Sequence, residues 1–223
     1  MLTRTEKSFT LIFALIVLLE LICGSTDSLS QLHYVTKPLV LVSLIIFFLK
    51  HNEHLGPKTK TVMLLALLFS LLGDILLMFV ENSSNFFIGG LVTFLLAHVM
   101  YILVFLKKRN QKKVSIPITF VLIIYASGLF YVLKDSLGEM FIPVIAYILV
   151  ILSMVISASL RKNSVSKASY NLVFIGALFF MVSDSVLAVN KFYNLIPLSN
   201  ILIMLTYAIA QYLIVIGVMK EKD

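Results

Sequence analysis

Long apolar segments, separated by short polar ones, follow one another along the whole chain. Eight of them approach the length of about 20 residues that an α-helix needs to cross a bilayer. They cover approximately residues 8–23, 35–49, 61–80, 86–106, 115–133, 140–160, 169–189 and 197–219. The second segment is short, so we expect its helix to extend to Thr36 and Lys50, with Pro38 in the first turn, where a missing N–H costs nothing. The pattern predicts an all-α, polytopic membrane protein with eight transmembrane helices.

The composition supports the same class of protein. Of the 223 residues, 60% are hydrophobic and 13% are charged, and the mean hydropathy is +1.04. Soluble domains are typically about 45–50% apolar and about 25% charged, so we expect a single integral membrane domain over residues 1–223. The one cysteine, Cys23, allows no internal disulfide, and the four histidines lack the spacing of zinc ligands. We therefore expect neither a metal ion nor another cofactor.

Basic residues lie mostly in alternate polar segments. Fifteen of the 18 lysines and arginines belong to one set of segments, which includes both ends of the chain, whereas the other set holds only Lys37, Lys134 and Lys191. Cytoplasmic loops carry the excess of positive charge, so both termini are expected in the cytoplasm, with the chain in the cell inner membrane. The basic run 107–113 is then a loop near anionic lipid, and no nucleic-acid partner is expected.

Two aspartates interrupt apolar segments at matching places. Asp74 lies in the segment 66–79 and Asp184 in the segment 176–192, about half the chain apart. A charge within the bilayer costs at least about 2.5–3.5 kcal/mol on insertion scales, so such a residue usually has a partner or a function. With the predicted orientation both acids lie in the outer half of the membrane, beside small residues that let helices approach closely. We expect both carboxyl groups to face one cavity inside the bundle, and we expect Glu20, near a helix end, to be solvated at the interface.

The two halves of the chain resemble each other beyond these acids. One span after each aspartate helix, an alanine precedes a polar side chain, as Ala97-His98 and Ala210-Gln211. A duplication of four helices, with repeats 1–110 and 111–223, explains this pattern. Because each unit has an even number of spans, the repeats are expected to be parallel.

At these residues the chain resembles the YhhN-like lysoplasmalogenases. The matching positions run in order from the second predicted helix to the eighth: Lys37-Pro38-Leu39, Ser70 with Gly73-Asp74, Ala97-His98 with Tyr101, Pro143, Ala146-Tyr147, Met154, Gly176-Ala177-Leu178-Phe179 with Ser183-Asp184, Leu187-Ala188, Phe192, Met204, Tyr207 and Ala210-Gln211. They span about three quarters of the chain. The resemblance implies an eight-span membrane enzyme that cleaves the vinyl ether bond of a lysophospholipid to a fatty aldehyde and a glycerophospho-base.

Two buried carboxyl groups suit this reaction. A vinyl ether opens when an acid protonates its β-carbon, and water then captures the oxocarbenium ion. Two nearby aspartates in an apolar site can share one proton, so that one serves as acid and the other as base, as two carboxyls do in glycosidases. Asp74 and Asp184 are the predicted catalytic pair, without an assignment of which is the acid.

Five further residues are predicted to bind the substrate, and each has a structural alternative. Lys37 is expected to hold the phosphate, although a lysine at a helix end often extends to the interface. His98 is expected to orient water or relay a proton, or else it bonds a neighbouring side chain. The remaining three, which line the site or bridge helices, are Tyr147, Tyr207 and Gln211.

A second class of function also fits the sequence. Buried acids in membrane helices carry protons or cations in transporters, and a lipid-binding protein without catalysis is a related alternative. Broken helices at the midplane would favour transport. No proline interrupts the segments that hold the two aspartates, which favours the enzyme.

Overall fold

The structure is a computed structural model, and it describes residues 3–110 and 116–221. These residues form eight α-helices and three short 3₁₀ turns, with no strand among them. The helices are α1 (Arg4–Ser25), α2 (Ser30–His51), α3 (Pro57–Leu77), α4 (Ser84–Lys107), α5 (Ile116–Leu133), α6 (Phe141–Ser159), α7 (Lys167–Phe192) and α8 (Ser199–Met219). The turns are η1 (Asp27–Leu29), η2 (Lys134–Ser136) and η3 (Gly138–Met140). All eight helices in the described ranges are long and apolar enough to cross a membrane, so the predicted all-α membrane fold is confirmed.

One predicted helix start is wrong. α2 begins at Ser30, and Pro38 therefore lies inside the helix rather than in its first turn. A transmembrane helix tolerates an internal proline where neighbouring helices and local adjustments satisfy the freed carbonyl group.

Some predictions concern positions outside the described residues. They include three of the basic residues used for the orientation, which are Lys112, Lys113 and Lys222. The start of the second predicted repeat at position 111 and the predicted start of the fifth segment at 115 also lie outside.

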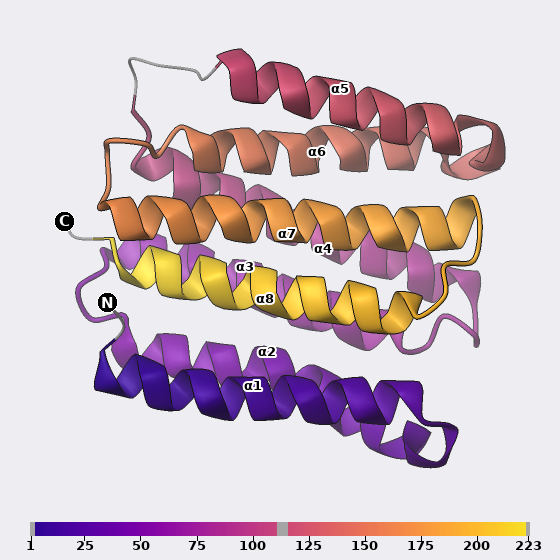
Figure 1. Cartoon of the computed structure of the whole chain (residues 1–223), viewed down its shortest axis with the longest axis horizontal. Helices are drawn as coiled ribbons and strands as arrows, with labels where there is room; N and C mark the ends of the chain where they lie inside the picture. Colours follow the sequence, from indigo (N-terminus) through magenta and orange to yellow (C-terminus); the bar gives the residue numbers. More distant parts are fainter. Residues whose placement is uncertain (1–2, 111–115, 222–223) are drawn as a thin grey trace.

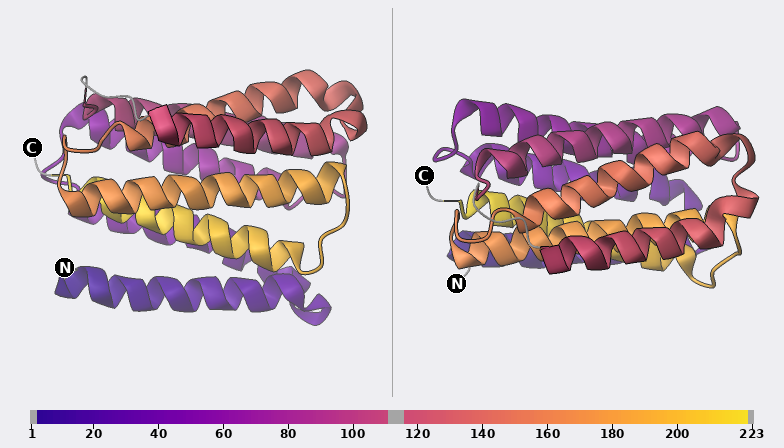
Figure 2. Two further views of the ribbon diagram at one scale, coloured as in Figure 1. Left: turned by 45° about the horizontal axis from the view of Figure 1, so that its top comes forward. Right: turned by 90° about the horizontal axis from the view of Figure 1, so that it is seen from above.

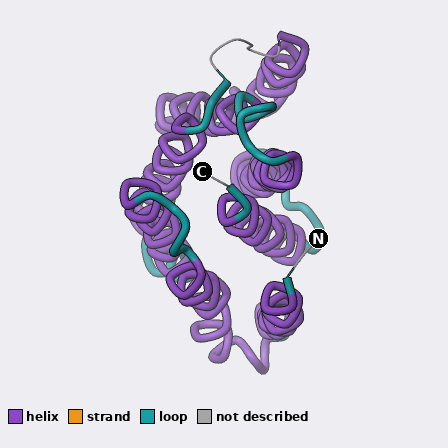
Figure 3. The backbone as a smooth tube through the Cα atoms, turned by 90° about the vertical axis from the view of Figure 1, so that its left-hand side faces the viewer, coloured by secondary structure: helices purple, strands orange, loops and turns teal. Residues whose placement is uncertain are grey.

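The helices form one bundle in which both chain ends lie together. Figure 1 shows the N- and C-termini at the same end, as an even number of spans requires, with α1 and α5 at opposite edges. In Figure 2 the helices run side by side in both turned views, and Figure 3 shows the same bundle from one end. The most extensive packing joins α3 to α4 and α7 to α8. These are equivalent pairs in the proposed repeat, which itself stays a prediction.

Glycines allow these two helix pairs to approach closely. A Cβ atom on Gly73 of α3 would lie 2.7 Å from the ring of Phe94 on α4. A Cβ on Gly176 of α7 would lie 3.0 Å from the carbonyl oxygen of Ala210 on α8. The small residues on both acid-bearing helices therefore allow close packing, as the sequence predicted: a side chain of α4 packs onto Gly73, and the backbone of α8 approaches Gly176.

A buried ion pair holds the end of the bundle where the termini lie. Arg161, which follows α6, is fully buried, and its Nη2 donates to Ser169 on α7 and, at 3.1 Å, to Glu221 at the end of α8. Burial lowers the pKa of Arg161, and the charge of Glu221 and its hydrogen bond oppose that shift. The pair links three chain segments far from both aspartates.

Candidate active site

Asp184 lies in an unbroken part of α7 and faces α6 and α4. The hydroxyl of Tyr147 on α6 donates a hydrogen bond of 2.8 Å to Oδ2 of Asp184. On α4, Nε2 of His98 lies 3.5 Å from the same oxygen. The side chain of Asp184 is 13% exposed, whereas His98 is fully buried. Three residues predicted from sequence for the site are therefore brought together by three different helices.

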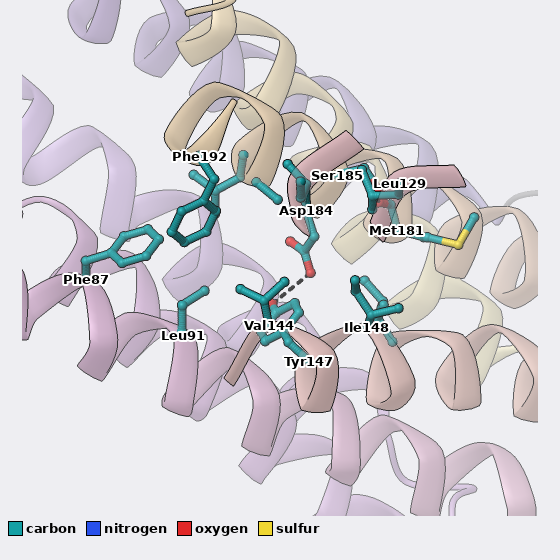
Figure 4. Close-up of a pocket in the computed structure, with 14 residues that line it drawn as sticks. Phe87, Leu91, Leu129, Val144, Tyr147, Ile148, Met181, Asp184, Ser185 and Phe192 are labelled. Atoms are coloured by element: carbon teal, nitrogen blue, oxygen red, sulfur yellow. Dashed lines mark hydrogen bonds between the residues drawn. The ribbon is translucent and has the colours of Figure 1, made fainter. Parts of the chain in front are cut away.

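A narrow, almost wholly apolar cavity opens beside this carboxyl group. Figure 4 shows Asp184 on its wall, bonded to Tyr147, with Phe87 and Phe192 toward one end and Met181 and Ile148 toward the other. The remaining lining residues come from α4 to α7: Leu91, Leu129, Leu133, Val144, Ile151, Ser185, Leu187 and Ala188. An apolar cavity with a few polar groups at one point is the usual form of a small-molecule site. The volume of this one is about 40 Å³, so it has room for only a few atoms beside Asp184, and a hydrocarbon chain enters it only when the surrounding side chains move.

His98 lies behind Asp184 and is enclosed by aromatic rings. Its ring packs edge-on against Tyr147 and against Phe180, with centroids 5.4 Å and 4.6 Å away. Within the part of the chain that the structure describes, neither ring nitrogen makes a hydrogen bond. Buried polar atoms normally have a partner, so His98 is suited to bonding Asp184 or a reacting molecule after a small shift.

Asp74 is buried, is bonded to a tyrosine and does not line the Asp184 cavity. It is 3% exposed, and the hydroxyl of Tyr207 on α8 donates a hydrogen bond of 2.8 Å to its Oδ2. The charges with electrostatic influence on Asp74 belong to Lys37, Glu20 and His33, from α1 and α2. Lys37 is thus associated with Asp74 and does not line the cavity at Asp184.

The expectation of a solvated Glu20 is wrong. Its side chain is 2% exposed, because the η1 turn folds the start of α2 back onto the end of α1. The hydroxyl of Thr36 donates to Glu20 Oε2 at 2.5 Å, and Nδ1 of His33 lies 2.9 Å from Oε1. Neither His33 nor Thr36 was predicted as part of a site. The sequence contained only a weak indication that these two residues contact an acid, because they lie outside the apolar core of the second segment.

Gln211 bridges three helices. Its Oε1 accepts a hydrogen bond from Tyr101 on α4, and its Nε2 donates to Ser70 on α3 at 3.0 Å. Gln211 is fully buried and does not line the Asp184 cavity. Its bonds match the structural alternative raised from the sequence, so that contact of Gln211 with a substrate stays a prediction.

Asp74 does not line the Asp184 cavity, so a cavity shared by both acids stays a prediction. Phe180 lies between their surroundings: its ring packs against His98 on one side and against Tyr207, 5.4 Å away, on the other. Phe94 adds a second ring beside Tyr207. We refer below to an Asp184 site, made of Asp184, Tyr147, His98 and the cavity, and to an Asp74 site. The latter comprises Asp74, Tyr207, Lys37, Glu20 and His33.

No group of three or more histidine, cysteine, aspartate or glutamate side chains in the described residues is arranged to hold a metal ion. The reactive groups near the two aspartates are carboxyl, hydroxyl, imidazole and ammonium groups. In the Asp184 site a carboxyl group, with a phenol bonded to it and an imidazole near it, faces apolar space. This arrangement can exchange a proton with an uncharged molecule held in the cavity.

The fold and the two sites define an integral, multi-pass membrane protein with carboxyl groups inside its helix bundle. The sequence model of the YhhN family matches residues 32–218, and the chain belongs to this family. The resemblance predicted from the sequence is thereby confirmed.

Curated relatives carry a common name. The chain is 25% identical to human lysoplasmalogenase TMEM86A over 205 residues, which cover 89% of this chain and 82% of the relative. It is 27% identical to the bovine protein of that name over 211 residues, which again cover 89% of this chain and 82% of the relative. Human lysoplasmalogenase TMEM86B is 32% identical over 137 residues, or 60% of this chain and 55% of the relative. No solved structure matches the chain.

Proposed function

We propose that this protein hydrolyses the vinyl ether bond of a lysoglycerophospholipid, releasing a fatty aldehyde and a glycerophospho-base. The observation that carries the proposal is the hydrogen-bonded carboxyl of Asp184 on the wall of an apolar cavity inside the bundle. The names of the TMEM86A and TMEM86B relatives support the same reaction. An inner-membrane location with cytoplasmic termini is part of the proposal and rests on the distribution of basic residues.

In the proposed mechanism Asp184 makes the first proton transfer. Its carboxylic acid donates a proton to the β-carbon of the vinyl ether, and the double-bond electrons form the new C–H bond. The resulting oxocarbenium ion is captured at the α-carbon by water, which gives a proton back to the Asp184 carboxylate. The hemiacetal then breaks its bond to the glycerol oxygen, which takes the hydroxyl proton, and aldehyde and alcohol are released. The acid is regenerated and no net proton is consumed.

Tyr147 and His98 support this proton transfer. The phenol of Tyr147 bonds Oδ2, which leaves Oδ1 of Asp184 for the proton and the substrate. A hydrogen bond to a carboxylate is stronger than one to the neutral acid, so Tyr147 favours the state of Asp184 that follows proton donation. A small movement of His98 would bring a second donor to the same oxygen or orient the attacking water.

Asp74 is the second proposed acid–base residue, but its contribution is indirect in this geometry. Phe180 separates the surroundings of the two acids, so Asp74 reaches a substrate at Asp184 only if this ring moves. Tyr207 bonds Asp74 as Tyr147 bonds Asp184. We propose that Asp74 and Lys37 set the polar environment at the outer side of the bundle.

The test is the release of aldehyde by the purified full chain in lipid nanodiscs. A 1-alkenyl lysophospholipid should yield aldehyde, whereas its saturated alkyl analogue should not react, because it cannot form the cation by protonation at carbon. Turnover should be slower in heavy water, since proton transfer to carbon limits the rate. Equal cleavage of both lipids, or no aldehyde from the alkenyl lipid, would contradict the proposal.

Proton- or cation-coupled transport is the second candidate function. The observation that favours it is the group of charged side chains around Asp74, because buried ionisable residues mark ion pathways in membrane proteins. The uninterrupted course of α3 and α7 favours the hydrolase instead. Flux of protons or cations into proteoliposomes, abolished by Asp74→Asn and unaffected by Asp184→Asn, would support transport.

A further inference from the structure

Among the described residues, three lysines and no arginine lie toward the end of the bundle opposite the termini. These are Lys37, Lys134 and Lys191. Asp184 lies in the part of α7 nearer this end, so we expect a lysophospholipid with its alkenyl group at Asp184 to place its phosphate here. The position of each lysine relative to the cavity can therefore identify the phosphate contact.

Lys191 lies beside the end of the cavity that Phe87 and Phe192 form. It belongs to the last turn of α7, two turns beyond Asp184 and on the same face of the helix. Its Nζ is 4.9 Å from the ring centroid of Phe87, and that ring meets Phe192 at 5.8 Å. Figure 4 shows both phenylalanines at one end of the cavity, on the far side of Asp184 from Met181. The ammonium group is thus positioned over the aromatic wall that ends the cavity.

The spacing along α7 matches the substrate. Seven residues of helix separate Asp184 from Lys191, a rise of roughly 10 Å. In a 1-alkenyl lysophospholipid the phosphorus is seven bonds from the β-carbon that receives the proton, or about 9 Å in an extended chain. The two lengths are similar, so a β-carbon at Asp184 places the phosphate at about the level of Lys191 along the axis of α7.

The other two lysines are positioned differently. Lys37 is among the charges that act on Asp74. Lys134 lies 3.8 Å from Oδ1 of Asp135, and its ammonium group is 5.0 Å from the ring centroid of Tyr131. Lys191 also offsets the negative end of the α7 dipole, which would otherwise repel a phosphate at the Phe87 end of the cavity.

We propose that Lys191, rather than Lys37, binds the phosphate of the lysolipid at the Phe87 end of the Asp184 cavity. This inference rests on the proposed function and adds a source of selectivity to it. The cavity recognises the alkenyl chain, and Lys191 distinguishes a phosphorylated lipid from an uncharged alkenylglycerol. The contact is exposed, so its contribution is small and sensitive to salt.

The experiment compares Lys191→Ala, Lys37→Ala and Lys134→Ala on two substrates, a 1-alkenyl lysophospholipid and the 1-alkenylglycerol that lacks the phosphate. Lys191→Ala should lower kcat/KM about fivefold on the phosphorylated substrate, mainly through KM, and leave the alkenylglycerol unchanged. Lys191→Arg should restore most of the loss. Lys134→Ala is the matched control, a second lysine on an aromatic ring at the same end of the bundle, and should match the wild type.

Two results would overturn the proposal. One is an equal effect of Lys191→Ala on both substrates, which indicates a structural role. The other is a phosphate-dependent loss in Lys37→Ala and not in Lys191→Ala. Inorganic phosphate is also tested as a competitor. It should inhibit the wild type if the site binds any phosphate, and it should have no effect if binding also requires the alkenyl chain in the cavity. Inhibition of the wild type that is lost in Lys191→Ala supports Lys191, whereas inhibition that persists in this variant contradicts it.

A binding measurement separates this inference from the proposed reaction. The saturated alkyl lysophospholipid cannot be cleaved by protonation at carbon, so its affinity can be measured whether or not the protein is an enzyme. Lys191→Ala should bind it about fivefold more weakly than the wild type, with no change for the corresponding alkylglycerol. If the wild type shows this difference but releases no aldehyde from the alkenyl lipid, the reaction is wrong and the phosphate site stands. Unchanged affinity in Lys191→Ala would contradict the site itself.

Discussion

The Asp184 site and the Asp74 site share one design and differ in their surroundings. Each aspartate lies the same number of residues after the first residue of its helix, and each accepts a hydrogen bond of 2.8 Å from a tyrosine on another helix. Asp184 has an imidazole and an apolar cavity beside it, whereas Asp74 lies within the influence of a lysine, a glutamate and a histidine. The same acid therefore lies beside an apolar cavity in one half of the chain and under the electrostatic influence of charged groups in the other.

The difference indicates a division of tasks between the halves. A carboxylic acid beside an apolar cavity can protonate a carbon atom of an uncharged group without competition from water. A carboxyl group surrounded by charges is better suited to organising a polar region. We therefore expect variants at the two sites to affect different measured quantities, and the predictions below separate them.

The largest effect is expected from Asp184→Asn. The amide keeps the shape of the side chain but has no acid proton to donate, so turnover of an alkenyl lysophospholipid should fall by about 10²–10⁴-fold. Binding of the saturated analogue should persist, which shows that the cavity is intact. Near-normal turnover in this variant would exclude Asp184 as the acid and return it to a structural or ion-coupling role.

The two tyrosines offer the next comparison. Tyr147→Phe removes the donor to Asp184, and since a hydrogen bond to a charged group is worth about 1.5–3 kcal/mol, kcat should fall by roughly tenfold or more. Tyr207→Phe leaves the buried Asp74 without this partner and should mainly lower the melting temperature of the purified protein. If Tyr207→Phe lowered kcat more than Tyr147→Phe did, the assignment of the chemistry to the Asp184 site would be reversed.

Asp74→Asn is expected to have a smaller effect than Asp184→Asn, with activity reduced about tenfold as is typical of remote coupling. The double variant decides between two schemes. Separate sites predict that the two losses multiply. Two carboxyls acting as one catalytic pair predict that the double variant is hardly worse than Asp184→Asn alone. Measurement of kcat for both single variants and the double variant distinguishes these cases.

The smallest effect is expected from filling the cavity. Ala188→Phe places a ring in the space assigned to the alkenyl chain, and overpacking of about 1–3 kcal/mol should raise KM several-fold. Val182→Phe is the control on the same helix, because Val182 is 40% exposed on the outside of the bundle. An equal rise of KM in both variants would show that the chain does not enter at the Asp184 cavity.

Much of the fold could be predicted because a bilayer imposes simple rules. A span must be apolar and about 20 residues long, so eight helices followed from the hydropathy pattern alone. The start of α2 was missed because the segment from Ser30 to Tyr34 contains serine, glutamine and histidine and does not look membrane-embedded, although the helix includes it. The burial of Glu20 was missed for the same reason, since the fold of η1 brings His33 and Thr36 to it.

The sequence by itself determined the class of protein, the number of spans and the two acids that need partners, because each depends on the cost of polar groups in hydrocarbon. Only the tertiary structure decided which partners they have. The neighbours of Asp184 and Asp74 come from helices distant in the chain, and side-chain volume decides where space remains. Phe180 separates the two acids, and Lys191 reaches Phe87 at the end of one cavity. Such contacts depend on how helices pack across the bundle, which local periodicity does not encode.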